Sequence, residues 1–248
     1  MSEEKLDMGG GAEERISVCV RVRPMRSAED AETWRADPAN GCVSEFSKAG
    51  KPVSGSQPTF DQVYGGKAES QDVFESVGRR VVDSVVDGIN GTIFAYGQTA
   101  SGKTHTIHGD AANPGLLPLA IQQIFRRIDE SPDRDFLVRI SYVEIYRETI
   151  RDLLVEDTPT LKLRDTQNKI TVGAQEIIIT EENQIMEYMH TASGRRQVAA
   201  TAMNDRSSRS HTIFRVIVES KLPGRKVRAR FVLRGKTTHT QRCSFVIL

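Results

Sequence analysis

The segment Gly97–Thr104, GQTASGKT, contains residue types that together can hold a polyphosphate. It fits the pattern GxxxxGK[ST], in which small residues let backbone N–H groups turn inward around phosphate oxygens. The ammonium of Lys103 can reach the β- and γ-phosphates, and the hydroxyl of Thr104 can bind Mg²⁺. A Gly/Ser turn with a solvated lysine is the alternative interpretation of this segment. A short apolar strand before the loop and a helix after it favour the phosphate site.

A second polar segment, Asn204–His211, has residue types that can sense a γ-phosphate. It places three hydroxyls, one amide, two guanidiniums and one imidazole within eight residues. Hydroxyls can bind Mg²⁺ or orient water, and a guanidinium can hold a phosphate or a carboxylate in a fork. A polar loop between a helix and a strand would have the same composition. Composition alone therefore leaves both interpretations open.

The third requirement of phosphoryl transfer is an acidic residue that holds the metal. The chain has 34 Lys and Arg against 33 Asp and Glu, yet no Asp or Glu follows Glu219. The stretch Lys221–Leu248 carries eight Lys and Arg residues, so an acidic body is followed by a basic tail. No residue of that tail can supply a metal-holding carboxylate.

The composition indicates a folded globular protein, because 38% of the 248 residues are hydrophobic and 27% are charged. The net charge of +1 argues against a globally basic nucleic-acid-binding protein. The N-terminus is unlike a signal peptide, and no run of about 18 apolar residues predicts a membrane span. No heptad pattern lasts three turns, so we expect no coiled coil for self-dimerisation. The three scattered cysteines indicate a reduced intracellular compartment.

Strand and helix patterns alternate around the two polar segments. Clusters of β-branched and aromatic residues predict strands at 16–22, 59–64, 92–96, 136–146 and 211–220. Apolar residues spaced three and four apart predict helices at 70–89, capped by Ser70, at about 114–132, and at 180–201. Two alternating runs around Asn168 predict a hairpin. Strands interleaved with helices predict an α/β fold with a mixed central sheet.

The chain divides into three parts by composition. We expect a flexible lead over 1–14, a folded body over 15–220 and a divergent basic tail over 221–248. The tail either covers a sheet edge with Val227–Leu233 or is disordered.

Five motifs, in this order along the chain, resemble the kinesin motor domain. They are Arg21–Pro24 (RVRP), Phe60-Asp61 with Val63-Tyr64, the block Thr92–His105, Tyr142–Tyr146 (YVEIY) with Asp152–Leu154, and Asn204–His211 (NDRSSRSH). The resemblance runs from about Ile16 to Ser220. Ala100 and the run from Thr201 to Arg215 are most similar to the centromere-associated mitotic kinesins. The resemblance implies a P-loop NTPase-type three-layer fold, in which helices flank a mixed central β-sheet, and an incomplete motor domain.

The resemblance implies ATP as nucleotide, Mg²⁺ as cofactor and a role for each site residue. The residues implied to line the nucleotide are Arg21, Pro24, Gly97, Gln98, Thr99, Ala100, Ser101, Gly102, Lys103, Thr104 and His105. Those implied to act in catalysis, as contacts to the γ-phosphate or water and as the first-switch arginine, are Asn204, Ser207, Ser208 and Arg209. Thr104 and Ser208 are the implied Mg²⁺ ligands. For Arg21, Arg23 and His105, solvated surface groups are the alternative interpretation.

The chain departs from the family after the strand at 211–220. Kinesins place a second switch, DLAGSE, on the following strand, whereas Lys226–Leu233 stands there in this sequence and no DxxG occurs. The salt bridge between Arg209 and a second-switch glutamate cannot form within the chain. We therefore expect ATP binding with impaired hydrolysis. We also expect a chain cut off before the second switch, as a splice variant, a gene-model artefact or a fragment would be.

The leading hypothesis is the nucleotide-binding part of a kinesin-type, microtubule-stimulated ATPase. Its expected location is the cytoplasm and cytoskeleton, at microtubules of the spindle or kinetochore, without nucleic acid or membrane as partner. We expect weak microtubule binding through the hairpin charges Lys162, Arg164 and Lys169, although solvated hairpin charges explain them equally well. The alternatives are a non-hydrolysing ATP-binding regulatory module and a degenerate product that does not fold stably. The Asn204–His211 motif argues against a P-loop enzyme acting on small molecules.

Overall fold

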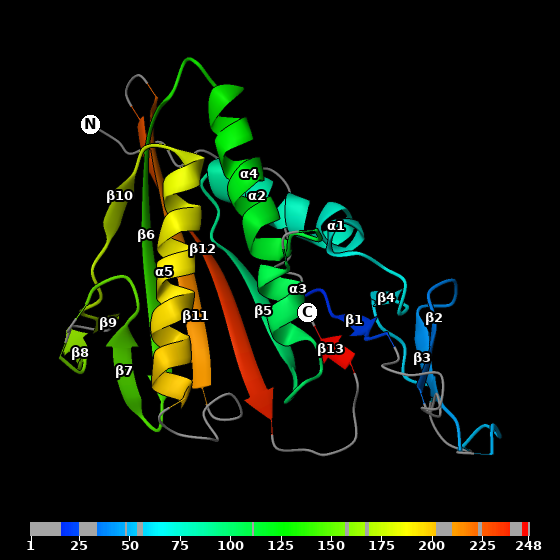
Figure 1. Ribbon diagram of the computed structural model, residues 1–248. Coiled ribbons are helices and arrows are strands. Elements are labelled where there is room, and N and C mark those ends of the chain that lie inside the picture. The colour runs from blue at the N-terminus through cyan, green and yellow to red at the C-terminus, as the bar shows by residue number, and fades with distance from the viewer. Residues whose placement is uncertain are drawn as a thin grey trace.

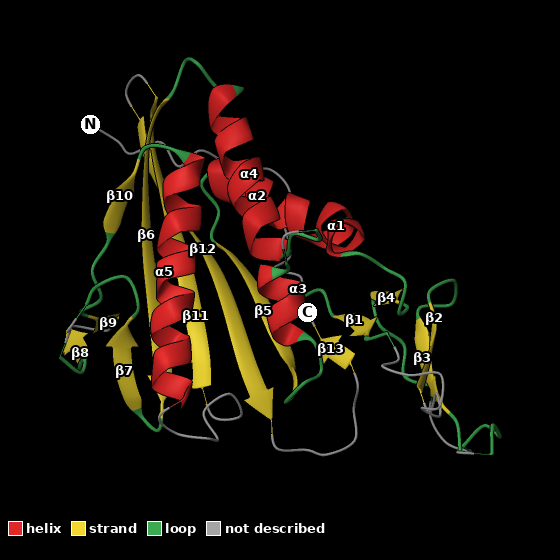
Figure 2. Cartoon of the chain, viewed as in Figure 1, coloured by secondary structure: helices red, strands yellow, loops and turns green. Residues whose placement is uncertain are grey.

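The chain forms a large twisted β-sheet with helices packed along it (Figures 1 and 2). The computed structural model describes residues 16–24, 34–47, 49–53, 57–110, 112–156, 159–166, 169–201, 210–222, 225–238 and 245–247.

The main sheet has nine strands and mixed direction. Eight follow one path, in the spatial order β10 (Ile177–Ile179), β6 (Asp135–Tyr146), β11 (Ser210–Leu222), β12 (Arg225–Thr238), β5 (Gly91–Gln98), β13 (Phe245–Ile247), β1 (Cys19–Val22) and β4 (Gln62–Tyr64). The ninth, β7 (Thr149–Asp152), pairs with β6. The pairs β12–β5 and β1–β4 are parallel, and the others are antiparallel. The predicted α/β fold with a mixed central sheet is confirmed.

Helices cover one face of the long strands, in front of the sheet as Figure 1 is drawn. They are α2 (Arg79–Val86), α3 (Lys103–His108), α4 (Leu116–Asp129) and α5 (Glu182–Thr201). The core lies between them and the sheet, where Phe214 and Phe231 belong to one apolar cluster with side chains of α4 and α5. Fully burying one such side chain contributes about 1.5–3 kcal/mol. None of the described helices is both long and apolar enough to cross a membrane.

The helix predicted at 70–89 is present in three pieces. These are α1 (Ser70–Val73), a π-helical turn η1 (Phe74–Gly78) and α2. The N-cap is Glu69, whose backbone N–H donates to Asp72 Oδ2 at 2.8 Å, so the expected cap at Ser70 is wrong. The Ser70 hydroxyl instead accepts a hydrogen bond from Arg21, 49 residues earlier in the chain.

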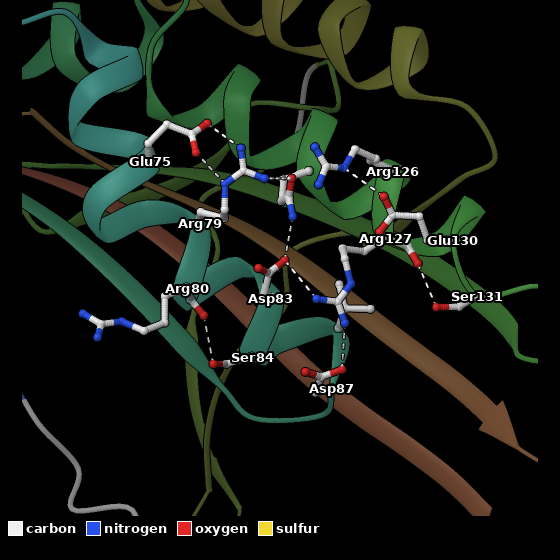
Figure 3. A network of polar contacts seen from close by, with 12 residues as sticks. Glu75, Arg79, Arg80, Asp83, Ser84, Asp87, Arg126, Arg127, Glu130 and Ser131 are labelled. Atoms are coloured by element: carbon white, nitrogen blue, oxygen red, sulfur yellow. Dashed lines mark hydrogen bonds and ion pairs between the residues drawn. The ribbon is translucent and has the colours of Figure 1, made fainter.

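A polar network joins α2 to α4 on the outer side of the helix layer (Figure 3). The buried side chain of Gln123 accepts from Arg79 Nη1 at 3.0 Å and donates to Asp83 Oδ1 at 2.6 Å. Arg127 lies 3.2 Å from Asp83 and 3.1 Å from Asp87. These contacts fix how α4 lies on α2, and α2 in turn packs against the start of β5.

Gly91, the first residue of β5, shows how closely α2 approaches the sheet. A Cβ atom at this position would lie 2.6 Å from Val81 Cγ1 and 3.0 Å from Val85 Cγ2. Any larger residue would push α2 away from the strand that leads into the Gly97–Thr104 loop. Glycine is therefore required by the close approach of two backbones.

The stretch Val227–Leu233 belongs to β12, which lies inside the sheet between β11 and β5. It therefore neither covers an edge nor lacks structure. Its residues Ala229, Phe231 and Leu233 are buried in the core. The predicted boundary between a folded body and a tail at residue 220 stays a prediction.

The remaining predicted elements match the structure closely. The hairpin around Asn168 is formed by β8 (Leu163–Thr166) and β9 (Lys169–Val172), and the strand at 136–146 and the helix at 180–201 correspond to β6 and α5. Between the strands predicted at 16–22 and 59–64, the structure also has a small hairpin, β2 (Trp34–Asp37) with β3 (Cys42–Glu45). These elements depend on local periodicity, which sequence reveals best.

We predict that Phe231→Ala lowers the free energy of unfolding by about 3–5 kcal/mol, because Phe231 is 0% exposed within the sheet. The matched control is Ile178→Ala on β10, which is 59% exposed and should cost about 0.5 kcal/mol or less. Chemical denaturation followed by circular dichroism measures both. Equal, small losses in the two variants would contradict the interior placement of β12.

Candidate phosphate-binding site

The loop between β5 and α3 turns sharply through two left-handed residues. Ala100 has φ 62° and Gly102 has φ 107°. Gly102 adopts such an angle freely, whereas for a residue with a Cβ it costs about 1–2 kcal/mol. The Ser101 N–H donates to Gln98 O at 3.3 Å, and the Gly102 carbonyl accepts from Thr106 N at 2.8 Å. The chain thus holds a strained, compact turn at the carboxyl end of a central strand, where strain commonly marks a functional site.

Lys103 folds back over this turn. Its Nζ donates to the carbonyl oxygens of Gly97 at 2.9 Å and Gln98 at 2.6 Å. The side chain is half-buried, and burial lowers the pKa of the Lys103 ammonium below its ordinary value. Its partners among the described residues are neutral carbonyls, so no carboxylate there balances its charge. An anion bound in the turn would balance this charge.

Two hydroxyls, those of Ser101 and Thr104, are available to contact a ligand. Ser101 is 1% exposed, and its Oγ has no hydrogen-bond partner within the described part of the chain. A buried hydroxyl without a partner is unfavourable and indicates a missing acceptor or donor. Thr104, at the start of α3, is exposed and accessible to a ligand. His105 is also exposed, with Nε2 3.7 Å from Asp110 Oδ2.

Arg21 is a buried clamp between β1, α1 and α3. Its Nη1 donates to Ser70 Oγ at 3.0 Å and Thr106 Oγ1 at 3.1 Å, and its Nη2 donates to the Ala68 carbonyl at 2.9 Å. Burial lowers the pKa of the Arg21 guanidinium. These partners belong to the protein itself. The predicted contact of Arg21 with a nucleoside stays a prediction.

Arg23 reaches the loop, although it was not among the residues implied to line the nucleotide. Its Nη1 donates to the Ala100 carbonyl at 2.6 Å. The sequence signal that could have predicted this contact was the spacing of Arg23 from Arg21. Residues two apart in an extended strand lie on the same face. Pro24 follows and is exposed, and a Cβ at Gly66 would lie 3.2 Å from Pro24 Cα. The structure thus brings the RVRP segment to the side of the loop.

The first-switch candidates Asn204, Ser207, Ser208 and Arg209 lie outside the described residues. The structure does describe where that segment ends. The Ser210 hydroxyl, at the start of β11, donates to Glu144 Oε1 at 2.6 Å. Glu144 is 1% exposed on β6, so this bond fixes the start of β11 to the neighbouring strand. The anchoring role of Glu144 was not predicted, because the partner lies 66 residues away.

The strand next to the loop carries basic and hydroxyl residues. The parallel register pairs Lys236 with Tyr96, Thr237 with Gly97 and Thr238 with Gln98. Two residues before Lys236 on β12, the Arg234 guanidinium lies 5.6 Å from the centre of the Phe94 ring. The described residues include no cluster of three or more His, Cys, Asp or Glu that could hold a metal ion. The loop therefore fits a polyphosphate, while it offers Mg²⁺ the exposed Thr104 hydroxyl.

Comparison with known proteins identifies the same family as the motifs. The family model "Kinesin motor domain" matches residues 21–241. Kinesin-like protein KIN-7I of Oryza sativa subsp. japonica is 42% identical over 217 residues, covering 84% of this chain and 17% of that protein. Centromere-associated protein E of Homo sapiens is 42% identical over 221 residues, covering 84% of this chain and 8% of that protein. The predicted resemblance to kinesins, and to the centromere-associated ones, is confirmed.

A solved structure of a fast kinesin has the same fold. It superposes with a TM-score of 0.80 at 31% sequence identity, covering 89% of this chain and 65% of that one. The predicted P-loop NTPase-type fold is therefore confirmed. The chain spans less than two thirds of this motor structure and less than a fifth of each of the two relatives.

We predict that Arg21→Ala lowers the free energy of unfolding by about 2–3 kcal/mol, because it leaves the Ser70 and Thr106 hydroxyls without their charged donor. Arg23→Ala is the matched control. Its side chain is half-buried, and its hydrogen bond to the Ala100 carbonyl is exposed, so its loss should cost less, about 1 kcal/mol. Thermal and urea unfolding of the two variants beside the parent chain measure this difference. Arg21→Ala unfolding like Arg23→Ala would refute the clamp.

Proposed function

The chain belongs to the kinesin motor domain family, and we propose that it acts as the ATP-binding part of a microtubule-based motor. The observation that carries the proposal is the Lys103 ammonium, held half-buried in a left-handed turn at the end of β5. A triphosphate would replace the Gly97 and Gln98 carbonyls as the partner of this charge. It would also give the buried Ser101 hydroxyl an acceptor.

Each part of the nucleotide has a proposed set of contacts. The triphosphate lies along the Gly97–Gly102 backbone with Lys103 on the β- and γ-phosphates. The nucleoside lies beside Arg21, Pro24 and His105. When bound, Mg²⁺ would neutralise phosphate charge, with Thr104 and Ser208 as its proposed protein contacts. Asn204 and Ser207 are proposed to face the γ-phosphate or the attacking water, as in the family.

Hydrolysis is proposed to be impaired in this chain. Efficient transfer needs the γ-phosphate held between two switches and a metal held by a carboxylate. The strand β12, which follows β11 and pairs with the loop strand β5, offers Arg234, Lys236 and Thr237 in place of an acid. Residues 220–248 contain no acid that could pair with the first-switch Arg209.

Microtubules are the proposed partner, with the β8–β9 hairpin as a contact of this chain. Lys162 and Arg164 are exposed there, as is Leu163 at 63%. Tubulin presents an acidic surface, which basic hairpin residues can approach. The proposed location is the microtubule cytoskeleton. The centromere-associated relative favours spindle or kinetochore microtubules as the narrower hypothesis.

A second candidate is a regulatory module that binds ATP without hydrolysing it. The absence of an acid from the whole of β12 favours it, because binding and transfer need different groups. In this case nucleotide occupancy, and not turnover, would be the output.

We predict that Lys103→Ala weakens ATP and ADP binding about 30- to 100-fold, the loss of one charge-assisted contact worth about 2–3 kcal/mol. Titration calorimetry measures the affinity, and circular dichroism confirms that the fold persists. The matched control is Lys51→Ala, an exposed lysine outside the loop, which should bind as the parent does. Equal affinities of the Lys103 and Lys51 variants would refute the proposed site.

We predict that microtubules raise phosphate release by the parent chain no further than they raise it for Lys103→Ala. The reason is that the residues of β12 leave transfer without a metal-holding acid. A coupled phosphate assay with polymerised tubulin measures the rates. Strong stimulation that disappears in Lys103→Ala would show that the chain hydrolyses ATP in spite of β12.

A further inference from the structure

We infer that nucleotide binding by this chain is largely independent of Mg²⁺, because basic and hydroxyl residues stand on the strand where a metal-holding acid is needed. The inference rests on the proposed nucleotide site. It adds to it the form of the ligand, a metal-free polyphosphate such as ATP⁴⁻, and the residues that select this form.

The register of β12 against β5 carries the argument. The two strands are parallel, so their carboxyl ends meet at one edge, which is where ligands bind in α/β sheets. The pairing continues through Thr237 with Gly97 and Thr238 with Gln98, the first two residues of the phosphate loop. Thr237 follows Phe231 and Leu233, which are buried in the core, by an even number of residues along the strand. A carboxylate from the adjacent strand would belong at this edge.

The charges at this edge have the wrong sign for a divalent cation. Lys103 and Arg23 come from the loop and from the end of β1, and both donate to loop carbonyls. β12 itself offers no carboxylate to this edge. Mg²⁺ prefers oxygen ligands, carboxylates above all, and cations nearby repel it. The same cations attract the additional negative charge of uncomplexed ATP.

Asp110, the acidic residue next to α3, does not supply the missing metal-holding carboxylate. Asp110 lies two residues beyond His108, the last residue of α3. Its Oδ1 accepts from the N–H groups of Ala112 and Asn113, both at 2.9 Å, and its Oδ2 faces His105. These N–H bonds lower the pKa of the Asp110 carboxyl and hold it in the 110–115 turn.

A second feature fits a phosphate in the turn. The Ser101 side chain is almost fully buried, and its hydroxyl has no partner in the part of the chain that the structure describes. A phosphate oxygen in the turn can accept a hydrogen bond from this hydroxyl. The hydroxyl therefore stabilises the polyphosphate whether or not a metal is bound.

The test compares ATP affinity of the full chain in MgCl₂ and in EDTA at matched ionic strength, by titration calorimetry. We expect the two dissociation constants to agree within about threefold. A loss of about 30-fold or more in EDTA would overturn the inference while leaving the proposed site intact. Failure of the proposed site has a different result, in which ATP does not bind in either buffer or binds equally to Lys103→Ala.

Thr237→Asp supplies the missing carboxylate, and Thr237→Asn is the matched neutral control. We expect Thr237→Asp to bind ATP about tenfold more weakly in EDTA than in MgCl₂, and Thr237→Asn to behave as the parent chain does. Electron paramagnetic resonance of Mn²⁺ with ATP gives a second readout, with protein-bound Mn²⁺ increased only by Thr237→Asp. Equal metal dependence of the two variants would contradict the assignment of Thr237. The parent-chain measurement decides the inference even if a variant does not fold.

Discussion

The half-buried ammonium of Lys103 is the interaction on which the site depends. It lies against the Gly97 and Gln98 carbonyls in a turn that Ala100 and Gly102 make possible through left-handed backbone angles. Burial disfavours the charged lysine, and neutral carbonyls compensate only in part. An anion in the turn relieves this imbalance. The affinity of the turn for phosphate thus follows from electrostatics that the fold imposes on one side chain.

The rest of the structure holds that turn in place. Gly91 lets α2 approach the start of β5, and the Arg21 clamp ties β1 to the helix that follows the loop. β12 lies beside β5 and buries Phe231 in the common core, so it fixes the opposite side of the loop strand. The same strand pairs with the first residues of the loop and carries no carboxylate. Support of the loop and the lack of a metal-holding acid beside it therefore come from one element.

Local patterns in the sequence predicted much of this fold and the centre of the site. Periodicity revealed β6, α5 and the β8–β9 hairpin, and the GQTASGKT pattern located the turn. Local patterns could not predict contacts between residues that are far apart in the sequence. The Arg21–Ser70 bond spans 49 residues and replaced an expected helix cap, and the Ser210–Glu144 bond spans 66. The position of β12 in the middle of the sheet was not predicted either. An alternating pattern such as the one around Phe231 is equally compatible with an edge strand.

The most direct test of the central claim is hydrogen–deuterium exchange of the chain with and without saturating ADP, read by mass spectrometry over peptides that span the β5–α3 turn. If a polyphosphate takes the place of the Gly97 and Gln98 carbonyls beside Lys103, exchange should slow at the amides of residues 97–106 and stay unchanged over the α2–α4 network. Bound nucleotide that leaves exchange at residues 97–106 unaltered would contradict the account.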